Sequence, residues 1–323
     1  MVEPYLVQSS PHLREKDTTP RIMVRVIISL LPAFLAAIYY FRLRALILMA
    51  VCVTAGLATE AVFLWARKRP LTPLFDGSAV ITGLLLALTL PPSFPPAFAI
   101  IGAVVSIAIG KQAFGGLGHN IFNPALVGRA FLATAFPVAM TTWLPPVTLK
   151  FDMATFATPL AILKFQDGVA QGILSPLRDL FWGNIGGCLG ETSAIALLIG
   201  GVYLLLRRTI DWRIPLGSML ALGFFSGAFW LADPGRYASP LFHLLGGGFL
   251  LGALFMATDM VTSPVTSKAI WVYALGLGLV IGIIRLFSGY PEGVMYGILF
   301  MNTFVPLLNH YLRPRILGER FKK

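Results

Sequence analysis

The chain has 323 residues, of which 57% are hydrophobic and only 12% are charged, and its formal net charge is +11. So few charges cannot cover a soluble domain, where about a quarter of the residues are charged, and the apolar content excludes a disordered chain. Two cysteines are too few for a disulfide scaffold. The composition therefore predicts a polytopic membrane protein.

Ten runs of apolar residues predict membrane-spanning helices, each of which needs about 20 residues to cross the hydrocarbon layer. In chain order they are residues 22–41, 45–65, 78–90, 98–110, 123–143, 188–206, 214–231, 243–257, 269–287 and 293–312. The first run follows a polar segment and is too long for the apolar part of a cleavable signal peptide, so none is expected. We expect these runs to lie in membrane lipid.

Several of the runs are too short or too interrupted to be simple spans. Residues 78–90 and 98–110 would each form about 20 Å of helix, and the prolines between 91 and 96 separate them. The run 243–257 is also short and leads into the polar stretch 258–264. Such segments at matching positions in two halves are typical of inverted-repeat transport proteins.

The two halves of the chain resemble each other weakly in sequence. Residues 81–89 align with 250–258 if one position is allowed to slip. The alternative is that any two helices rich in leucine and glycine look alike. We expect an all-α polytopic membrane protein with about ten transmembrane helices in two inverted five-helix repeats, some of them broken or half-length.

The expected organisation has five segments. They are a cytoplasmic N-terminal segment (1–21), the first repeat (22–143), an outer loop (144–187), the second repeat (188–312) and a basic tail (313–323). Ten spans place both termini on one side, and Lys and Arg are concentrated in the segments of that side. The positive-inside rule therefore predicts cytoplasmic termini and an outer location for the loop. The same rule explains the net positive charge, so no nucleic-acid partner is expected.

The loop between the halves contains a string that runs from Asp152 to Pro159. From the residue types alone, this string predicts a turn and a short extended segment, because Pro159 keeps Thr158 out of the helical conformation. A connection of about 40 residues is unusually long, and long loops often carry function.

A string rich in glycine and asparagine follows the fourth apolar run. Gly115 and Gly116 allow the backbone to bend at membrane depth, where irregular chain persists only if it is buried or lines a cavity. Asn120 and Asn123 can bond the backbone groups that such a bend frees. Two interpretations stay open: tight helix packing, or a cofactor or ion site at the repeat interface, with Lys111 at the start of the string.

Ionisable residues inside apolar runs are functional candidates, because charge is costly in hydrocarbon. These residues are Arg25, Glu60, Arg129, Glu191 and Asp259. Asp259 lies at the broken end of a half-helix and is a candidate ligand for a cation. The four histidines show no spacing typical of a metal site, so no metal centre is expected.

The string in the outer loop resembles a known motif. Asp152, Thr155, Ala157 and Thr158 match the flavinylation motif Asp-x-x-(Ser/Thr)-Gly-Ala-Thr, whose last threonine carries FMN through a phosphoester bond. Phe156 stands where the motif has glycine. The resemblance implies covalent FMN on Thr158, attached by a flavin transferase.

The resemblance extends along the whole chain. The segments that resemble the RnfD family, a membrane component of the Rnf ion-translocating oxidoreductase, are 10–14, 19–23, 76–79, 82–87 and 111–125. The sister family is NqrB of the sodium-translocating NADH:quinone reductase, whose members usually have a longer N-terminal extension. That family also holds riboflavin, so a second, non-covalent flavin is an alternative that the residues leave open.

The resemblance implies a component of a complex in the bacterial inner membrane, with the other Rnf subunits as partners and no activity alone. Such a complex couples ferredoxin:NAD⁺ electron transfer to Na⁺ or H⁺ transport. The implied cofactor-binding residues are Thr158, Asp152, Thr155, Ala157, Lys111, Gly115, Gly116, Asn120 and Asn123. The rival interpretation is a stand-alone secondary transporter or channel with no redox centre, which would have no need of the motif ending in Thr158.

Overall fold

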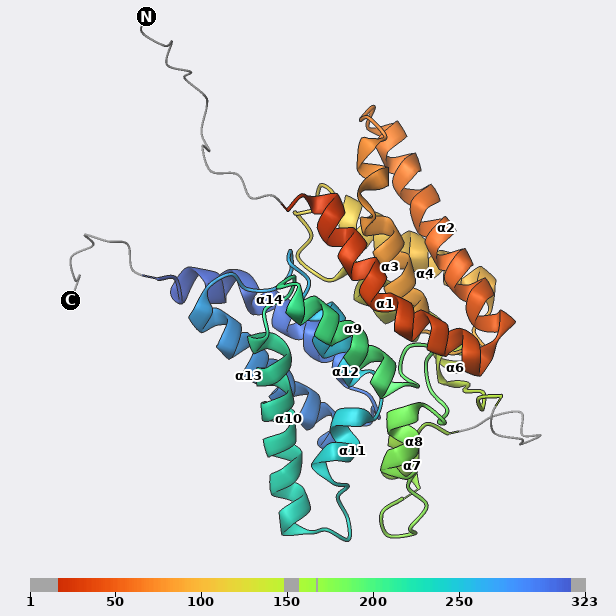
Figure 1. The fold of residues 1–323 in the computed structure, drawn as a ribbon, viewed down its shortest axis with the longest axis vertical. Coiled ribbons are helices and arrows are strands. Elements are labelled where there is room, and N and C mark those ends of the chain that lie inside the picture. Colours follow the sequence, from red (N-terminus) through yellow and green to blue (C-terminus); the bar gives the residue numbers. More distant parts are fainter. Residues whose placement is uncertain (1–16, 148–156, 167, 315–323) are drawn as a thin grey trace, which may run out of the picture.

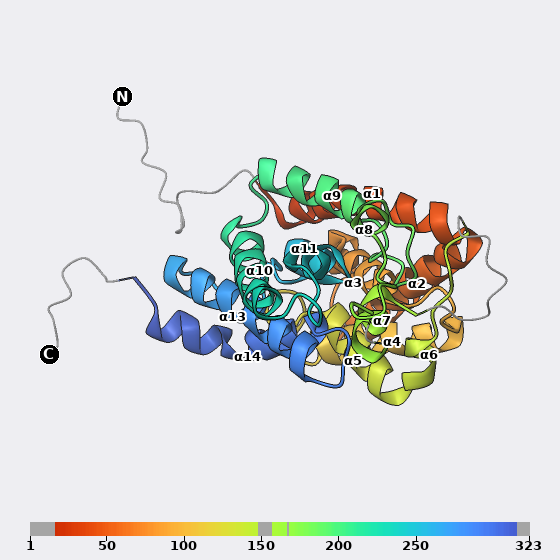
Figure 2. The same cartoon turned by 90° about the horizontal axis from the view of Figure 1, so that it is seen from below.

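The computed structural model describes residues 17–147, 157–166 and 168–314. Within these residues every regular element is helical, from α1 to α14, with three short turns of 3-10 or π geometry (Figures 1 and 2). The all-α polytopic fold expected from the sequence is confirmed.

Four helices are long and apolar enough to cross a membrane: α1 (Thr19–Phe41), α2 (Leu43–Ala66), α10 (Arg213–Ala232) and α13 (Ser267–Phe287). At 1.5 Å per residue, helices of this length span the hydrocarbon core of roughly 30 Å. Large apolar side chains such as Phe224 are exposed on their outer faces. An exposed apolar face is what lipid contact requires.

The third and fourth helices of the first half are short. A 3-10 turn, η1 (Thr72–Asp76), leads into α3 (Ser78–Leu88), and α4 covers Pro96–Ile107. The prolines between α3 and the start of α4 prevent one continuous helix, because proline is accepted in the first helical turn but not in the interior. The end of α4 widens into a π-turn, η2 (Ala108–Gln112).

The structure corrects the single span expected at 123–143. Helix α5 covers Pro124–Ala135, and α6 (Pro137–Thr141) is a separate short helix. Phe136 between them is not helical, with φ −132° and ψ 58°. The break falls at Pro137, whose ring lacks an N–H and clashes with the preceding helical turn.

The segment between the halves contributes two short helices, α7 (Pro159–Phe165) and α8 (Leu177–Trp182). The hydroxyl of Tyr40, near the C-terminal end of α1, donates to the carbonyl of Trp182 at 2.8 Å. This contact ties the inter-half segment to the end of α1 that is distant from the chain's N-terminus.

Two expected spans of the second half are shorter than predicted. Helix α9 (Ala194–Leu206) begins only where Ser193 caps its first turn. The run 243–257 is divided among α11 (Pro240–Leu245), α12 (Phe249–Leu251) and the π-turn η3 (Gly252–Met256). Glycines 246 to 248 break the helix, and Gly247 adopts a positive φ of 67°.

The two halves meet along two helix pairs. Helix α9 packs along α1, and α14 (Val294–Tyr311) contacts α5 (Figure 2). Gly200 of α9 lies against the carbonyl of Ser29 in α1, where any Cβ would collide with it. Such small residues let membrane helices approach closely. The inverted relation of the two halves and the five segment boundaries stay predictions.

Candidate functional site

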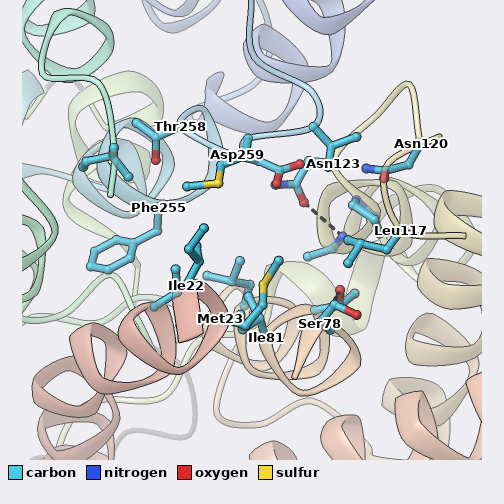
Figure 3. Close-up of a pocket in the computed structure, with 18 of the residues that line it drawn as sticks. Ile22, Met23, Ser78, Ile81, Leu117, Asn120, Asn123, Phe255, Thr258 and Asp259 are labelled. Carbon is cyan, nitrogen blue, oxygen red and sulfur yellow. Dashed lines mark hydrogen bonds between the residues drawn. The ribbon is translucent and has the colours of Figure 1, made fainter. Parts of the chain in front are cut away.

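A cavity of about 100 Å³ lies where the two halves meet (Figure 3). Ile22 of α1 and Thr82 of α3 line it from the first half, and Phe255 of η3 and Asp259 line it from the second. The cavity is therefore a feature of the interface between the halves, since neither half encloses it alone.

Most residues that line the cavity are apolar, and the polar ones come from both halves. Figure 3 shows Ser78 and Asp259 on different sides of the space. Among the described residues, the charged groups of the lining are Lys111 and Asp259. Apolar walls with a few placed polar groups are typical of sites for small organic molecules.

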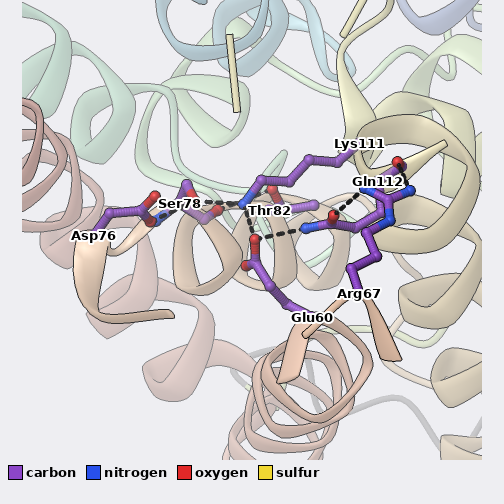
Figure 4. A network of polar contacts seen from close by, with 7 residues as sticks. All are labelled: Glu60, Arg67, Asp76, Ser78, Thr82, Lys111 and Gln112. Atoms are coloured by element: carbon purple, nitrogen blue, oxygen red, sulfur yellow. Dashed lines mark hydrogen bonds and ion pairs between the residues drawn. The ribbon is translucent and has the colours of Figure 1, made fainter. Parts of the chain in front are cut away.

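Lys111 reaches the cavity wall from the π-turn η2 and is held by a buried polar network (Figure 4). Its Nζ lies 2.6 Å from Oε1 of Glu60 and 2.5 Å from Oγ of Ser78. The side chains of Lys111 and Glu60 are each only 2% exposed. A buried ammonium and carboxylate are tolerated because each compensates the other's charge.

The network continues on both sides of this ion pair. The amide of Gln112 donates to the same Glu60 oxygen at 3.0 Å, and Arg67 donates to the carbonyl of Gln112 at 2.6 Å. On the other side, Oδ1 of Asp76 accepts from the backbone N–H of Ser78 at 2.7 Å. These contacts join α2, η1, α3 and η2 into one rigid wall of the cavity.

The two predicted asparagines have different roles. Asn123 caps α5 through the N–H groups of Ala125 and Leu126, and its Nδ2 donates across the interface to the carbonyl of Met256 at 3.2 Å. Asn120 donates to the carbonyl of Phe122, but its buried Oδ1 has no partner among the described residues. A buried acceptor without a partner is costly, and both side chains line the cavity.

The two predicted glycines shape the turn and do not line the cavity. Gly115 and Gly116 have φ of 121° and 105°, which side-chain-bearing residues rarely adopt. Their N–H groups donate to the carbonyls of Gln112 and Lys111, both at 3.1 Å. This tight turn returns the chain so that Lys111 and Asn120 both reach the cavity.

Asp259 lines the cavity, and its carboxylate accepts from the hydroxyl of Thr262 at 3.0 Å. Within the described part of the chain, the one group of three close metal-ligand side chains is Cys188, Glu191 and Glu292, which does not include Asp259. A cation site near Asp259 therefore stays a prediction.

Thr158 begins α7 and is buried, at 4% exposure. Its Oγ1 accepts from the N–H of Ala161 at 3.2 Å, as an N-cap residue does. Ala157 beside it is half-buried. Asp152 and Thr155, the other two motif residues, lie outside the described residues.

Helix α7 is anchored to the second half of the chain. The Nζ of Lys164 donates to the carbonyls of Arg285 and Tyr290 at 2.9 and 3.0 Å, and weakly to that of Ile284. A cation at the C-terminal end of α13 interacts favourably with the helix dipole. Leu160 of α7 packs against Leu180 of α8 in a small apolar cluster that is separate from the main core.

The family model described as the NQR2, RnfD, RnfE family matches residues 6–318, which is nearly the whole chain. The chain belongs to this family. The D component of the Na⁺-translocating ferredoxin:NAD⁺ oxidoreductase complex of Acetobacterium woodii is 48% identical to it, and the match covers 97% of this chain and 95% of that one. The family resemblance expected from the sequence is confirmed.

Two further relatives in the NQR2, RnfD, RnfE family carry related names. The D component of the proton-translocating ferredoxin:NAD⁺ oxidoreductase complex of Clostridium ljungdahlii is 42% identical, over 98% of this chain and 97% of that one. The D component of the ion-translocating oxidoreductase complex of Stutzerimonas stutzeri is 39% identical, over 94% and 93%. All three are named as subunits of ion-translocating complexes, although the first two names specify different ions.

A second polar cluster in the chain lies beside Thr158. Thr158, Glu191 and Glu292 line one small space of about 10 Å³. Arg129 of α5 lies 2.7 Å from a Glu292 oxygen, 3.5 Å from a Glu191 oxygen and 3.7 Å from Sγ of Cys188. The guanidinium thus contacts both carboxylates and joins the first half to the second.

Sequence reasoning found some of these residues and missed their pairing. Glu60, Arg129 and Glu191 stand out as charges in apolar runs, but nothing in their spacing indicates a partner. Glu292 follows a proline in a short polar stretch and gives no signal at all. The pairings depend on how helices far apart in the sequence pack, which one sequence does not specify.

Proposed function

We propose that the chain is the RnfD-type membrane component of a complex that couples ferredoxin:NAD⁺ electron transfer to Na⁺ or H⁺ translocation, and that it carries FMN covalently on Thr158. The observation that carries the proposal is the match of Asp152, Thr155, Ala157 and Thr158 to the flavinylation motif. It occurs in a chain whose relatives are named as subunits of such complexes.

The chain depends on partners for its reaction. Iron–sulfur clusters are typically held by four cysteines, whereas this chain has two, Cys52 and Cys188, both buried and free. No Gly-x-Gly-x-x-Gly string follows a strand to bind a dinucleotide. Other Rnf subunits therefore supply the sites for ferredoxin and NAD⁺, and a flavin transferase supplies the attachment reaction.

The surroundings of Thr158 constrain where an attached flavin lies. A space of about 10 Å³ cannot contain a flavin ring. The Thr158 oxygen is therefore the point of attachment, and the group it carries projects out of this space. The contacts of Lys164 hold α7 in place while it does so.

The polar groups of the cavity between the halves fit a second, non-covalent flavin. A bound flavin supplies one- and two-electron transfer. The unpartnered Oδ1 of Asn120 requires a donor, whereas the ammonium of Lys111 has a third N–H that requires an acceptor. The pyrimidine ring of riboflavin offers both kinds of group, whereas an oxidised quinone offers acceptors only.

The inter-half segment contacts the end of α1 that lies opposite to the cavity. Ile22 and Met23 near the start of α1 line the cavity, and Tyr40 near its end binds the carbonyl of Trp182 in the inter-half segment. With cytoplasmic termini in a bacterial inner membrane, the cavity is on the cytoplasmic side and Thr158 on the outer side. Electrons from a cytoplasmic donor then reach Thr158 through a carrier at the cavity.

The test is covalent fluorescence on a denaturing gel. The chain is co-expressed with a flavin transferase, and the wild type is compared with Thr158→Ala and with Thr134→Ala, a threonine on the exposed face of α5. We expect fluorescent bands for the wild type and Thr134→Ala and none for Thr158→Ala. Fluorescence that persists in Thr158→Ala moves the attachment elsewhere. A wild type without fluorescence supports a transporter with no redox centre.

A further inference from the structure

Lys111 is the cation of the cavity wall that η2 forms. The cavity meets the charge of Lys111 directly, but it does not meet the charge of its counter-ion in the same way. Lys111 belongs to the cavity lining, whereas its counter-ion Glu60 does not. A molecule in the cavity is therefore nearer to the positive end of this ion pair than to the negative end. The other charged group of the described lining is the carboxylate of Asp259, from the second half, so Lys111 supplies the positive charge that a bound molecule meets.

The ammonium also has bonding capacity left for a ligand. A lysine carries three N–H donors, and two are used by Oε1 of Glu60 and Oγ of Ser78. Ser78 is itself held by Asp76, so its oxygen cannot move away from the ammonium without losing that contact. The remaining donor and the charge are thus fixed at the wall of the cavity.

We propose that Lys111 is the residue that sets the redox potential of the molecule bound in this cavity, with Glu60 holding the ammonium in position. The inference rests on the proposed second flavin. An electron that arrives on the bound molecule adds one negative charge, and the nearby ammonium stabilises that charge without any bond being formed or broken. The charge of a protein group beside a flavin is one of the means by which proteins tune it.

The opposite end of the molecule provides an internal reference. The inter-half segment contacts the end of α1 opposite to the cavity, and Glu191 and Glu292 line the space beside Thr158. A change at Lys111 is therefore expected to affect the non-covalent flavin and to leave a flavin on Thr158 unchanged. The distance along a membrane-spanning helix reduces the field there.

The experiment is a redox titration of the assembled complex, followed by visible absorbance, with flavin extracted and quantified from each sample. The main variant is the double substitution Lys111→Met with Glu60→Gln, which removes both charges and leaves no unpaired carboxylate in the interior. Lys111→Arg is the matched control, because it keeps the charge. The single variant Lys111→Met is measured beside them.

We expect the double variant to bind the oxidised non-covalent flavin. The equilibrium constant for its reduction should be about tenfold lower than in the wild type, which lowers the reduction potential by about 59 mV for one electron. In Lys111→Arg, the potential of the non-covalent flavin is expected to shift by less than a third of that amount. The potential of the flavin on Thr158 is expected to stay the same in every variant. An unchanged potential in a flavin-loaded double variant overturns the role of Lys111. So does an equal shift in Lys111→Arg, because a packing defect alone would produce it.

Loss of the flavin is also informative. If the double variant loses it and Lys111→Arg keeps it, the charge of Lys111 binds the molecule, which supports the inference. If all three variants lose it equally, the charge is irrelevant and the inference is wrong. A wild-type complex without any extractable flavin instead overturns the proposed second flavin, so the two failures are distinguishable.

Discussion

The cavity at the N-terminal end of α1 and the pocket around Thr158 differ in how much of a binding site is already formed. The cavity has a volume of about 100 Å³, apolar walls and a lysine ammonium held by hydrogen bonds, whereas the space beside Thr158 has a volume of about 10 Å³. A molecule held without a covalent bond depends on a shaped, largely preformed site. A molecule held by a covalent bond does not need an enclosing site, so the smaller pocket is compatible with the motif.

The two regions also differ in charge. At the cavity, one ammonium meets one carboxylate, Lys111 with Glu60. Beside Thr158, the guanidinium of Arg129 lies within 4 Å of two carboxylates, Glu191 and Glu292. Gly247, which also lines this space, lies beside the guanidinium of Arg285, so two cations face two carboxylates there. The two regions therefore differ in the cations that they hold, a single ammonium at the cavity and two guanidinium groups beside Thr158.

The largest expected effect tests whether the two regions lie on opposite sides of the membrane. Cys52 and Cys188 are replaced, single cysteines are introduced at Gln166 and Glu319, and intact cells are treated with a membrane-impermeant thiol reagent. We expect position 166 to be labelled and position 319 not, because the distribution of Lys and Arg predicts cytoplasmic termini.

Permeabilised cells serve as the control for this labelling, since both cysteines should react there. The reverse pattern in intact cells would place Thr158 on the cytoplasmic side. Electrons would then need no path across the membrane to reach it, and the contrast between an inner and an outer flavin would be lost.

A second prediction separates the two regions by occupancy. Ile81 of α3 lines the cavity, and Ile81→Trp fills part of the space with an indole ring. We expect the affinity for the non-covalent flavin to fall about 5- to 150-fold, since overpacking a preformed site costs about 1–3 kcal/mol. Covalent fluorescence at Thr158 should be unchanged.

Ile81→Leu, which conserves the volume, is the matched control and should keep the non-covalent flavin. If Ile81→Trp retains a full complement of it, the cavity is not its site. If covalent fluorescence is also lost, the substitution has damaged the whole chain, and the two regions are not independent in the way that their separation along α1 requires.

The sequence predicts the helical architecture well, because the length of an apolar run and the position of prolines are local properties. Prolines 91 to 96 mark the gap between α3 and α4. The break at Pro137 is equally visible but lies inside a run long enough to look like one span. The π-turn η3 and the interruption at Gly247 depend on packing, so the apolar pattern does not predict them.

The candidate sites are predictable as residues but not as arrangements. Lys111, Asn120 and Asn123 line the cavity together with Asp259, as a site at the interface between the halves requires. The partner of Lys111 is Glu60, 51 positions away, and only the packing of α2 against α4 brings them together. A single sequence carries no information on such distant pairs.

The smallest expected effect concerns the anchor of α7. In Lys164→Met, the carbonyls at the end of α13 lose a cationic donor, and α7 loses its main polar contact with the second half. Hydrogen bonds to charged groups contribute about 1.5–3 kcal/mol, so amides of α7 should exchange about 10- to 100-fold faster with solvent deuterium. Lys268→Met, at the exposed start of α13, is the matched control and should leave α7 unchanged.

The same substitution bears on the comparison of the two regions, because Thr158 begins α7. In Lys164→Met, the threonine should become more mobile than the residues of the cavity wall. Unchanged exchange in α7 would mean that the apolar contacts of Leu160 alone hold the helix and that Lys164 has no part in positioning the threonine.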